Sequence, residues 1–277
     1  TSGSASGIAT ITQGTGGNVN QFTLTPQQSG SGGTFSVKFS ATDPNSNVAL
    51  SSASSFTLTF TVNASVVFDG TNDYLSLGGS ADFEVSASGI ARTIEFWVYR
   101  TAGAYEPYYY IYDPSNASTR FKLLYWGSDN KFYQFHAYGA NNNIYQISTN
   151  AHTEAGWEHI AQVRNASSGE WKTYLNGTLV PGMTVTASAE NSSSGYSMYI
   201  GREDKYSGYF GGKISNFRLV HAEVYTANFT TPTANLTAIT NTKLLTCNDA
   251  SAIEDDSTSN HTITAHNGAA ADSAGPF

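Results

Sequence analysis

The stretch Ser55-Phe56-Thr57-Leu58-Thr59-Phe60-Thr61-Val62 alternates strictly between hydroxyl and apolar side chains. A period of two places the apolar set on one face of a β-strand and the polar set on the other face. The runs at 21–25 and 34–39 alternate in the same way. Serine, threonine and asparagine divert hydrogen bonds from a helical backbone, and glycine destabilises a helix by about 1 kcal/mol relative to alanine. The sequence therefore predicts an all-β protein, with at most a short helix at 80–90.

Composition excludes several functional classes. The 277 residues include 13 basic and 21 acidic side chains, for a net charge of −8, so the basic footprint of a nucleic-acid-binding protein is absent. The chain has one cysteine, Cys247, which excludes an intramolecular disulfide framework and leads us to expect a small buried apolar residue. No run approaches the ~18 apolar residues of a membrane span, so we expect no membrane insertion. The chain begins with Thr1, and we expect a processed chain or a piece of a longer one.

Aromatic residues divide the chain into two regions. Residues 1–63 contain no tryptophan or tyrosine, whereas both are frequent from residue 64 onward. We therefore predict a small β module at 1–63 and one large β-sandwich at 64–277. Within the second region, Asn176-Gly177 supplies the positive φ angles of a tight hairpin, which predicts that 170–175 and 178–180 pair as antiparallel neighbours. Alternation also predicts that Phe96 and Trp97 point to opposite faces of a strand, one of them into the core.

Four segments of the second region resemble the concanavalin A-like, laminin-G-like lectin/glucanase superfamily. They are Val67–Leu77 (VFDGTNDYLSL), Ile94–Tyr99 (IEFWVY), Trp157–Arg164 followed by Tyr174–Gly177, and Ile200–Gly201 followed by Phe210–Leu219. The resemblance implies a concanavalin A-like jelly-roll β-sandwich. Within the superfamily, the second region is most similar to modules of phage tail fibres and other virion appendages. Residues 224–233 resemble the extension that follows the last sheet strand in that type, and 244–247 with 256–264 resemble the strand pair after it. Residues 10–14 and 41–43 resemble an Ig-like β module that precedes such domains.

Enzymatic carboxylates are not evident in the sequence. Glucanases of this superfamily carry an E-x-D-x-E strand, in which alternation places nucleophile and acid on one face. No such run occurs here, and we interpret Glu203-Asp204 and Glu254-Asp255-Asp256 as loop charges. His159 falls in a predicted central strand, where we expect a packing role. The sequence thus predicts a non-enzymatic protein.

The resemblance also implies a calcium site at the rim of the sandwich. Calcium prefers six to eight oxygen ligands from carboxylates and carbonyls. The candidate ligands are Asp69, Asp73 and Asp256. The alternative is that these residues form Asx-turns, in which the carboxylate accepts backbone N–H groups. The superfamily's last sheet strand commonly reads Gly-x-Ile-Asp-Asp, and Ser215-Asn216 stand there in this chain, so two carboxylates are missing.

Aromatic residues crowd into 105–138, which predicts a binding surface. If 107–112 is a strand, Tyr108, Tyr110 and Tyr112 share one face. Tyrosine offers an apolar ring with a polar tip, which suits sugar rings as well as protein contacts. The alternative is that these rings fill the sandwich or are covered by a neighbouring module or subunit. The predicted ligand-binding residues are Tyr108, Tyr110, Tyr112, Tyr125, Trp126, Tyr206 and Tyr209.

Two functions remain open at this point. The first is a non-enzymatic adhesion module of a virion appendage, located on the virion surface or outside the cell, that binds a host cell-surface glycan. The second is a structural, decoration or filament protein whose sandwiches bind other virion proteins. Either role is consistent with a homo-oligomer. Because one fold serves many functions, the choice between them depends on the site.

Overall fold

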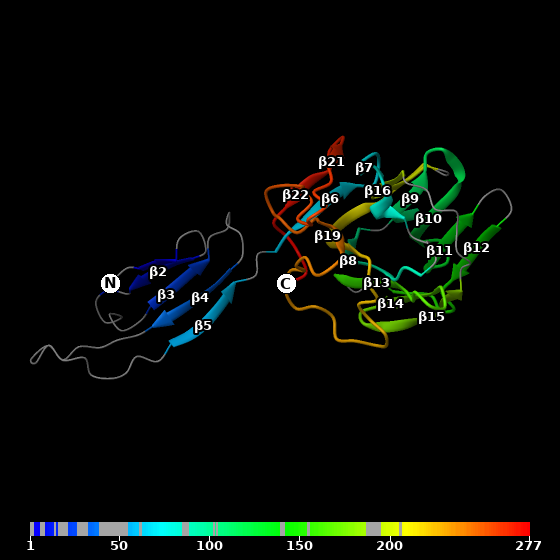
Figure 1. The fold of residues 1–277 in the computed structure, drawn as a ribbon. Helices are drawn as coiled ribbons and strands as arrows, with labels where there is room; N and C mark the ends of the chain where they lie inside the picture. The colour runs from blue at the N-terminus through cyan, green and yellow to red at the C-terminus, as the bar shows by residue number, and fades with distance from the viewer. Residues whose placement is uncertain are drawn as a thin grey trace, which may run out of the picture. The chain divides into compact units, whose positions relative to one another are not determined.

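The structure is a computed structural model that describes residues 3–5, 9–13, 15, 22–26, 33–38, 55–60, 63–84, 89–101, 103, 105–138, 142–153, 156–186, 195–204 and 207–277. The chain divides into two compact units, Thr1–Val62 and Asn63–Phe277 (Figure 1). In the first unit, β1 (Gly3–Ala5), β2 (Ala9–Gln13) and β3 (Phe22–Pro26) form an antiparallel sheet in that order. β4 (Gly33–Lys38) pairs with β5 (Ser55–Phe60). The alternating runs are thus strands wherever they are described, and the Ig-like character of residues 1–63 stays a prediction.

The second unit contains a seven-stranded sheet in the order β12-β11-β10-β9-β16-β7-β21. All neighbouring strands in it are antiparallel. Their bounds are β7 (Tyr74–Ser80), β9 (Tyr105–Asp113), β10 (Asn116–Trp126), β11 (Lys131–Tyr138), β12 (Asn142–Ile147), β16 (Tyr196–Ile200) and β21 (Ile263–His266).

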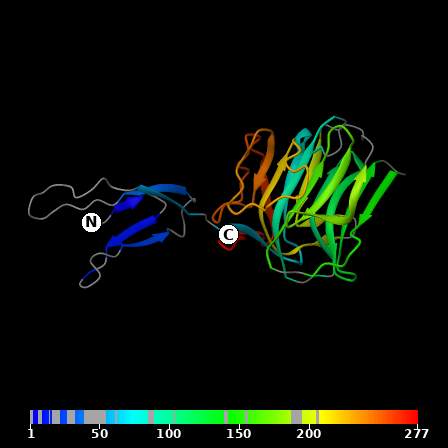
Figure 2. The same ribbon diagram turned by 90° about the horizontal axis from the view of Figure 1, so that it is seen from below.

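An eight-stranded sheet faces it, in the order β15-β14-β13-β8-β19-β6-β22, with β20 paired to β19. The bounds are β6 (Ser65–Asp69), β8 (Arg92–Arg100), β13 (Glu158–Arg164), β14 (Glu170–Leu175), β15 (Thr178–Thr186), β19 (Gly211–Val220), β20 (Thr242–Thr246) and β22 (Ala270–Asp272). Among the described residues, the second unit also contains a hairpin of β17 (Arg202–Glu203) and β18 (Gly208–Tyr209) and the 3-10 turn η2 (Ala81–Phe83). Figure 1 shows the strands of the two sheets in two layers, and Figure 2 shows the same strands from below. The second unit is therefore a jelly-roll β-sandwich, as predicted.

The apolar core lies between the two sheets. Phe96 of β8 is fully buried there, whereas its neighbour Trp97 lies on the outer face, with its ring 5.1 Å from His159 and 5.7 Å from Phe277. The prediction that these two rings point to opposite faces is confirmed. Residues 244–247 and 256–264 each contribute to a strand, and the Asp256 N–H donates to the Leu245 carbonyl at 2.8 Å, but the two strands do not form a ladder with each other. Their strands β20 and β21 join different sheets, through β19 and β7 respectively.

A chain of polar side chains crosses the core. The Tyr109 hydroxyl donates to Gln162, whose amide donates to Thr173 Oγ1 at 3.2 Å. Thr173 Oγ1 donates to Gln134 Oε1 at 2.8 Å, and Gln134 Nε2 lies 2.5 Å from His136 Nε2. The strands of these residues, β9, β13, β14 and β11, belong to both sheets, so the hydrogen bonds join the layers. A satisfied buried network of this kind specifies one packing of the sheets.

The hairpin predicted at Asn176-Gly177 is confirmed. Leu175 pairs with Thr178 and Tyr174 with Leu179, and the two turn residues have φ angles of 47° and 76°. A positive φ at both central positions is the geometry of a type I′ turn.

Replacing Gly177 with alanine is expected to lower the free energy of unfolding by about 2–3 kcal/mol, because a side chain is strained at positive φ and must also displace its neighbours. An added Cβ would lie 1.9 Å from the Phe229 carbonyl oxygen. Gly89→Ala is the matched control: Gly89 has φ +74°, and no atom lies within 4 Å of the position that an added Cβ would take. Urea unfolding measures both variants, and equal losses would show that the Phe229 contact contributes nothing.

Candidate ligand-binding face

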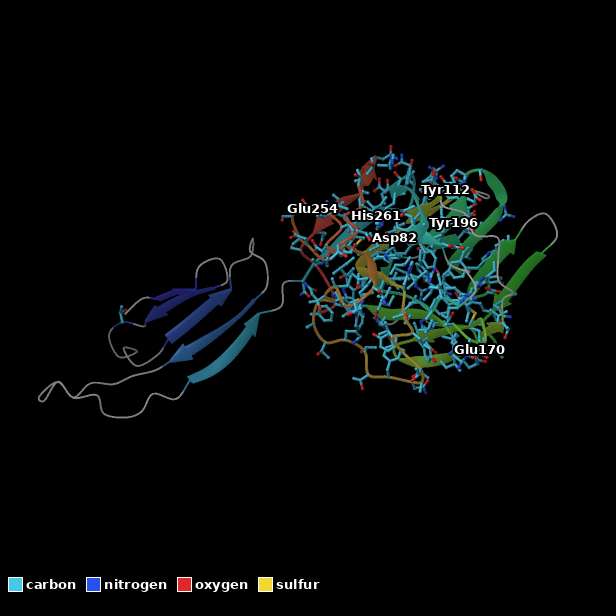
Figure 3. All side chains as sticks on the ribbon, viewed as in Figure 1. Asp82, Tyr112, Glu170, Tyr196, Glu254 and His261 are labelled. Carbon is cyan, nitrogen blue, oxygen red and sulfur yellow. The ribbon has the colours of Figure 1, made fainter. Side chains whose placement is uncertain are left out.

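Tyrosines from neighbouring strands gather on the outer face of the seven-stranded sheet. Tyr112 lies on β9, Tyr199 on β16 and Tyr74 on β7, and these strands are adjacent in the sheet. Side chains on one face of adjacent strands meet across the strands. Figure 3 labels Tyr112 in this layer, and Glu170 of β14 in the other. We name the set the tyrosine face; its members are Tyr74, Tyr110, Tyr112, Tyr199 and Tyr209.

The rings of the tyrosine face contact one another in sequence across the sheet. Tyr110 and Tyr112 are stacked with their centroids 5.2 Å apart, and Tyr112 lies 5.2 Å from Tyr199. The Tyr112 hydroxyl donates to the Tyr199 hydroxyl at 2.9 Å. Tyr74 continues the row with its ring 5.4 Å from that of Tyr199. The result is a continuous surface of aromatic rings with hydroxyl groups among them.

Polar groups border the row of rings at the end formed by Tyr74. The Tyr74 ring stacks on the His266 imidazole at 4.1 Å, and His266 Nε2 lies 2.8 Å from Ser76 Oγ. These residues come from β7 and β21, so the end of the row is built by the last strand of the sheet. An aromatic ring next to imidazole and hydroxyl groups is the combination that a ligand with an apolar face and many hydroxyls requires.

Arg202 of the β17–β18 hairpin lies over the same rings. Its guanidinium carbon is 4.6 Å from the Tyr74 centroid and 5.0 Å from that of Tyr199, both within cation–π range. Arg202 Nη2 also forms an ion pair with Asp204 at 2.6 Å. Because the carboxylate of Asp204 compensates it, the guanidinium adds rigidity to the face without adding net charge.

Four of the five tyrosines are half-buried, namely Tyr74, Tyr112, Tyr199 and Tyr209, while Tyr110 is buried. Burial raises the pKa of Tyr110 to about 12. Burial, together with the hydrogen bond from Tyr112, raises the pKa of Tyr199 above its ordinary value. Both hydroxyls therefore stay protonated at neutral pH and remain able to donate hydrogen bonds.

The prediction that Tyr108 shares a face with Tyr110 and Tyr112 is wrong. The pairing of β10 with β9 shifts between Leu123 and Leu124, which face Tyr109 and Pro107. Tyr108 is thus the extra residue of a β-bulge, which disrupts the alternation of faces along the strand.

Two predicted ligand-binding residues consequently lie inside the sandwich. Tyr108 is 0% exposed, with its ring 5.5 Å from Phe96 and 5.7 Å from Phe210. Tyr125 is 4% exposed and packs under the Arg100 guanidinium at 3.7 Å. The correction for Tyr125 follows from register, because β10 places it on the core side with Leu123. Neither side chain is available to a ligand on the outer surface.

Trp126 belongs to a second aromatic group on the outer face, which we name the Trp126 group. It comprises Tyr105, Trp126 and Tyr133. The Trp126 ring is edge-on to Tyr105 at 5.7 Å and tilted on Tyr133 at 5.3 Å, and the Tyr133 hydroxyl donates to Asp129. Trp126 is 38% exposed, which is high for a tryptophan in a strand. Tyr206, also predicted to bind ligand, lies outside the described residues.

The β17–β18 hairpin lies against strand β9. It contacts the Trp126 group through Gly208 and contributes Tyr209 to the tyrosine face. Glu203 is fully buried and forms an ion pair with Lys122 of β10 at 2.8 Å. This corrects the interpretation of Glu203 as a loop charge, since only Asp204 of that pair is exposed. Gly208 packs directly on the Tyr105 ring, where an added Cβ would lie 2.3 Å from Cδ1.

The three predicted calcium ligands do not converge. Asp69 Oδ1 accepts the backbone N–H groups of Thr71 and Asn72 at 2.7 and 3.1 Å, and these bonds lower the pKa of its carboxyl. Asp73 accepts the N–H groups of Asp69 and Gly268 at 3.0 and 2.6 Å.

Asp256 instead accepts from the Asn248 amide at 2.6 Å. Within the described ranges, no three His, Cys, Asp or Glu side chains lie close enough together to hold a metal ion. The geometry of Asp69 and Asp73 is that of turn formers. Calcium dependence therefore stays a prediction, and the positions of Asp69, Asp73 and Asp256 do not support it.

The remaining sequence expectations concern loops and single residues. Residues 254–256 lie outside regular structure, and Glu254 and Asp256 are exposed, as predicted for loop charges. Asp255, however, is buried and accepts the backbone N–H groups of Leu245, Ser257 and His261. Cys247 is 1% exposed, and burial raises the pKa of its thiol to about 12, in agreement with a structural role. In the part of the chain that is described, no helix has the length and apolarity needed to cross a membrane.

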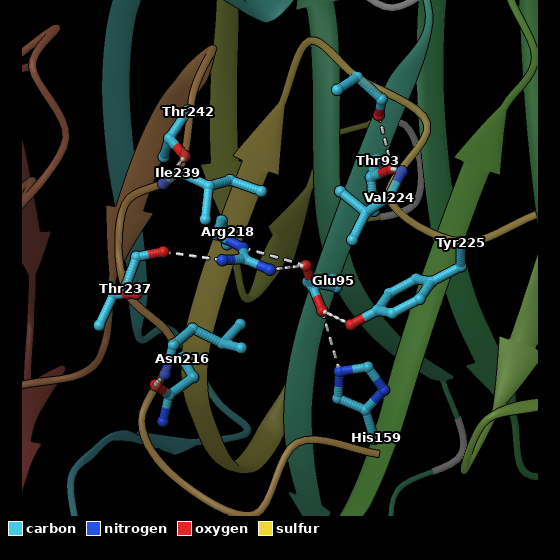
Figure 4. Close-up of polar contacts among 12 residues, drawn as sticks. Thr93, Glu95, His159, Asn216, Arg218, Val224, Tyr225, Thr237, Ile239 and Thr242 are labelled. Atoms are coloured by element: carbon cyan, nitrogen blue, oxygen red, sulfur yellow. Dashed lines mark hydrogen bonds and ion pairs between the residues drawn. The ribbon is translucent and has the colours of Figure 1, made fainter. Parts of the chain in front are cut away.

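The outer face of the eight-stranded sheet is partly covered by the segment after β19. The Tyr225 hydroxyl donates to Glu95 Oε2 at 2.7 Å, and Arg218 Nη2 pairs with Glu95 Oε1 at 2.6 Å (Figure 4). His159 Nε2 lies 3.3 Å from the same carboxylate and is 0% exposed, so the expected packing role of His159 is confirmed. Phe229 stacks on Tyr225 at 3.5 Å. The tyrosine face lies on the other sheet.

Two antiparallel sheets with these strand orders define a jelly-roll β-sandwich module. Residues 69–227 match the family model described as the concanavalin A-like lectin/glucanases superfamily, over more than half of the chain. The chain belongs to that superfamily.

Solved structures give the same fold at low sequence identity. A native heptameric SAP-like pentraxin from Limulus polyphemus superposes with a TM-score of 0.52 and 13% identity, covering 76% of this chain and 95% of that chain. A candidate carbohydrate binding protein from Bacteroides ovatus superposes with a TM-score of 0.55 and 16% identity, covering 83% of this chain and 66% of that chain. A search of curated protein sequences found no match.

Four residues of the candidate site escaped the sequence analysis, namely Tyr74, Tyr199, Arg202 and His266. Tyr74 and Tyr199 alternate with the core residues Leu75 and Met198, so strand periodicity places both on an outer face. Periodicity does not reveal that β16 lies between β9 and β7 in the sheet, because the order of the strands depends on the tertiary structure.

Proposed function

We propose that the second unit is a non-enzymatic glycan-binding module and that the tyrosine face is its ligand-binding surface. The row of half-buried rings from Tyr112 to Tyr74 is the observation that carries the proposal. Sugar rings present apolar C–H faces that pack on aromatic rings, while their hydroxyls bond to polar side chains. The Tyr112 and Tyr199 hydroxyls and the His266 imidazole are placed for that second role.

The positions of buried carboxylates support binding without hydrolysis. Glycosidases need two carboxyl groups on either side of the scissile bond, about 5–10 Å apart. Glu95 and Glu203 are each fully buried in ion pairs, with Arg218 and Lys122. Neither carboxylate faces a ligand on the tyrosine face. The Bacteroides ovatus structure, a candidate carbohydrate binding protein with the same fold, is consistent with this class.

We further propose that this module belongs to a virion appendage, where it is exposed on the virion surface as part of a homo-oligomer and binds a bacterial surface glycan. The support is the resemblance of segments 67–77, 94–99 and 224–233 to phage tail-fibre modules. Fluorescently labelled full chain, applied to a panel of bacterial strains, tests this role. Binding that is lost after periodate oxidation of the cell-surface sugars supports it, and cell binding that survives oxidation contradicts it.

Tyr112→Ala and Tyr199→Ala are each expected to weaken glycan binding about tenfold or more, because a central aromatic contact contributes about 2 kcal/mol to affinity. The measurement is a glycan-array screen of the full chain followed by calorimetry with the best glycan. Tyr99→Ala is the matched control, since Tyr99 is a 39% exposed tyrosine on the eight-stranded sheet.

The array is run with calcium and with chelator. Binding lost in chelator supports the predicted calcium dependence, and binding that survives removes it while leaving the module a lectin. If the folded full chain binds no glycan in either buffer, the proposal is wrong, and the tyrosine face is better explained as a contact between virion proteins.

A further inference from the structure

We propose that the ligand is an uncharged, extended polysaccharide chain that contacts both the tyrosine face and the Trp126 group. This inference rests on the proposed function and narrows it to a ligand class. It follows from three features of the outer face of the seven-stranded sheet: the spacing of the two aromatic groups, the hairpin between them, and the compensation of their charges.

The far members of the two groups are too far apart for a single sugar. Tyr105 of the Trp126 group and Tyr112 of the tyrosine face both lie on β9, seven positions apart. At about 3.3 Å per residue along a strand, with one residue taken up by the bulge, the two rings are about 20 Å apart. A ligand that reaches from the Trp126 group to Tyr112 must therefore span several sugar units.

The β17–β18 hairpin contacts both groups and holds their spacing. Gly208 packs on the Tyr105 ring, and the next residue, Tyr209, belongs to the tyrosine face with its ring 6.3 Å from Tyr74. The hairpin is fixed to the sheet by the buried Glu203–Lys122 ion pair, and Lys122 Nζ also donates to the Tyr105 hydroxyl at 3.0 Å. The two groups thus form one preorganised surface, which reduces the entropy lost on binding a chain.

Two cations of this surface, Arg202 and Lys122, are compensated by carboxylates of the same hairpin, and a third, Arg120 of β10, hydrogen-bonds the Tyr110 hydroxyl, which the same two carboxylates also influence. Asp204 pairs with Arg202 at 2.6 Å, and Glu203 pairs with Lys122 at 2.8 Å. The chain as a whole carries a net charge of −8, which repels a polyanion. Stacking surfaces with internally paired charges suit a neutral polysaccharide rather than an acidic one.

The test is affinity electrophoresis of the full chain in gels that contain neutral polysaccharides (galactomannan, β-glucan, amylopectin) or anionic ones (alginate, polygalacturonate). We expect retardation by at least one neutral polymer, unchanged when the ionic strength rises from about 0.05 M to about 0.5 M. Calorimetry with disaccharide to octasaccharide fragments of that polymer then measures the dependence of affinity on chain length. Trp126→Ala is expected to reduce affinity about tenfold for the longest fragment and to leave the disaccharide unaffected, whereas Tyr199→Ala weakens both.

The outcomes separate this inference from the proposed function. If Trp126→Ala, with an unchanged circular dichroism spectrum, has no effect at any chain length, the extended site is wrong and the tyrosine face remains a glycan site. Retardation only by anionic polymers, abolished by salt, overturns the uncharged ligand while the module still binds glycans. If the full chain binds no polymer and no array glycan, both proposals fail. Tyr99→Ala again serves as the control, because it removes an exposed ring from the other sheet.

Discussion

Glu95→Ala is expected to lower the free energy of unfolding by about 3–5 kcal/mol, because it leaves the buried Arg218 guanidinium without its counter-ion. The Glu95 carboxylate is 0% exposed and accepts from Arg218 Nε and Nη2 at 3.0 and 2.6 Å and from the Tyr225 hydroxyl at 2.7 Å. Burial raises the pKa of Glu95, but the hydrogen bond with His159 and the charge of Arg218 outweigh it and hold the pKa below its ordinary value. Glu95 therefore attaches the covering segment to β8 through Tyr225, beside the hydrogen bonds that Thr93 of β8 makes with Ala222 and Val224.

Urea unfolding measures the loss, and Glu170→Ala is the control. Glu170 forms an ion pair with Lys172 at 2.9 Å, but both side chains are about one-third exposed, at 32% and 35%. Surface pairs of this kind contribute less than about 1 kcal/mol. A second variant, Tyr225→Phe, removes a hydrogen bond but no charge and is expected to cost about 1–2 kcal/mol. Similar small losses for Glu95→Ala and Glu170→Ala would contradict the anchoring role of Glu95.

Acid is expected to destabilise the second unit below about pH 6.5, with His136 as a principal cause. Burial, with a smaller contribution from Arg164, lowers the pKa of His136 to about 3. Unfolded histidine has a pKa near 6.5, so between about pH 6.5 and pH 3 the unfolded chain binds a proton that the folded chain does not. Stability therefore falls as the pH is lowered through this window, by about 1.4 kcal/mol per pH unit at the steepest, and levels off below it for this group.

The measurement is the free energy of unfolding at a series of pH values for the parent chain and for His136→Asn. The variant keeps a hydrogen-bonding group opposite Gln134 but does not titrate. Between about pH 6.5 and pH 3, we expect the free energy of unfolding of the variant to change less steeply with pH than that of the parent chain, by up to the equivalent of one bound proton. The slope does not vanish, because burial also lowers the pKa of the half-buried His221 to about 4. Identical slopes for the two chains would show that His136 takes up its proton in the folded state.

Local sequence predicted much of this fold. The Asn176-Gly177 turn, the alternation at Phe96 and Trp97 and the buried Cys247 all appear in the structure as expected. Each of these depends on the preferences of a few neighbouring residues, namely positive φ, strand alternation or apolarity. Such preferences act within the chain and do not require knowledge of a distant partner.

The candidate site was predicted only in part. Tyr110, Tyr112 and Tyr209 lie in the tyrosine face and Trp126 in the second group, but Tyr108 and Tyr125 are in the core. The error at Tyr108 arose from a bulge, which depends on the register between β9 and β10 rather than on the sequence of either strand. Glu203 was even less accessible to prediction, since its partner Lys122 lies on a strand distant in sequence, and the contact of Arg202 with Tyr74 is equally distant.

By itself, the sequence determined that the chain is built of β-strands, that its turns lie where glycine and asparagine permit positive φ, and which side chains alternate along each strand. Only the tertiary structure decided which strands are neighbours. That order brings Tyr74, Tyr112 and Tyr199 into one row and places Gln162, Gln134 and His136 in a shared hydrogen-bonded network between the sheets. The physical reason is that alternation depends on the local backbone, whereas contacts across strands and sheets depend on register and packing between segments far apart in the chain.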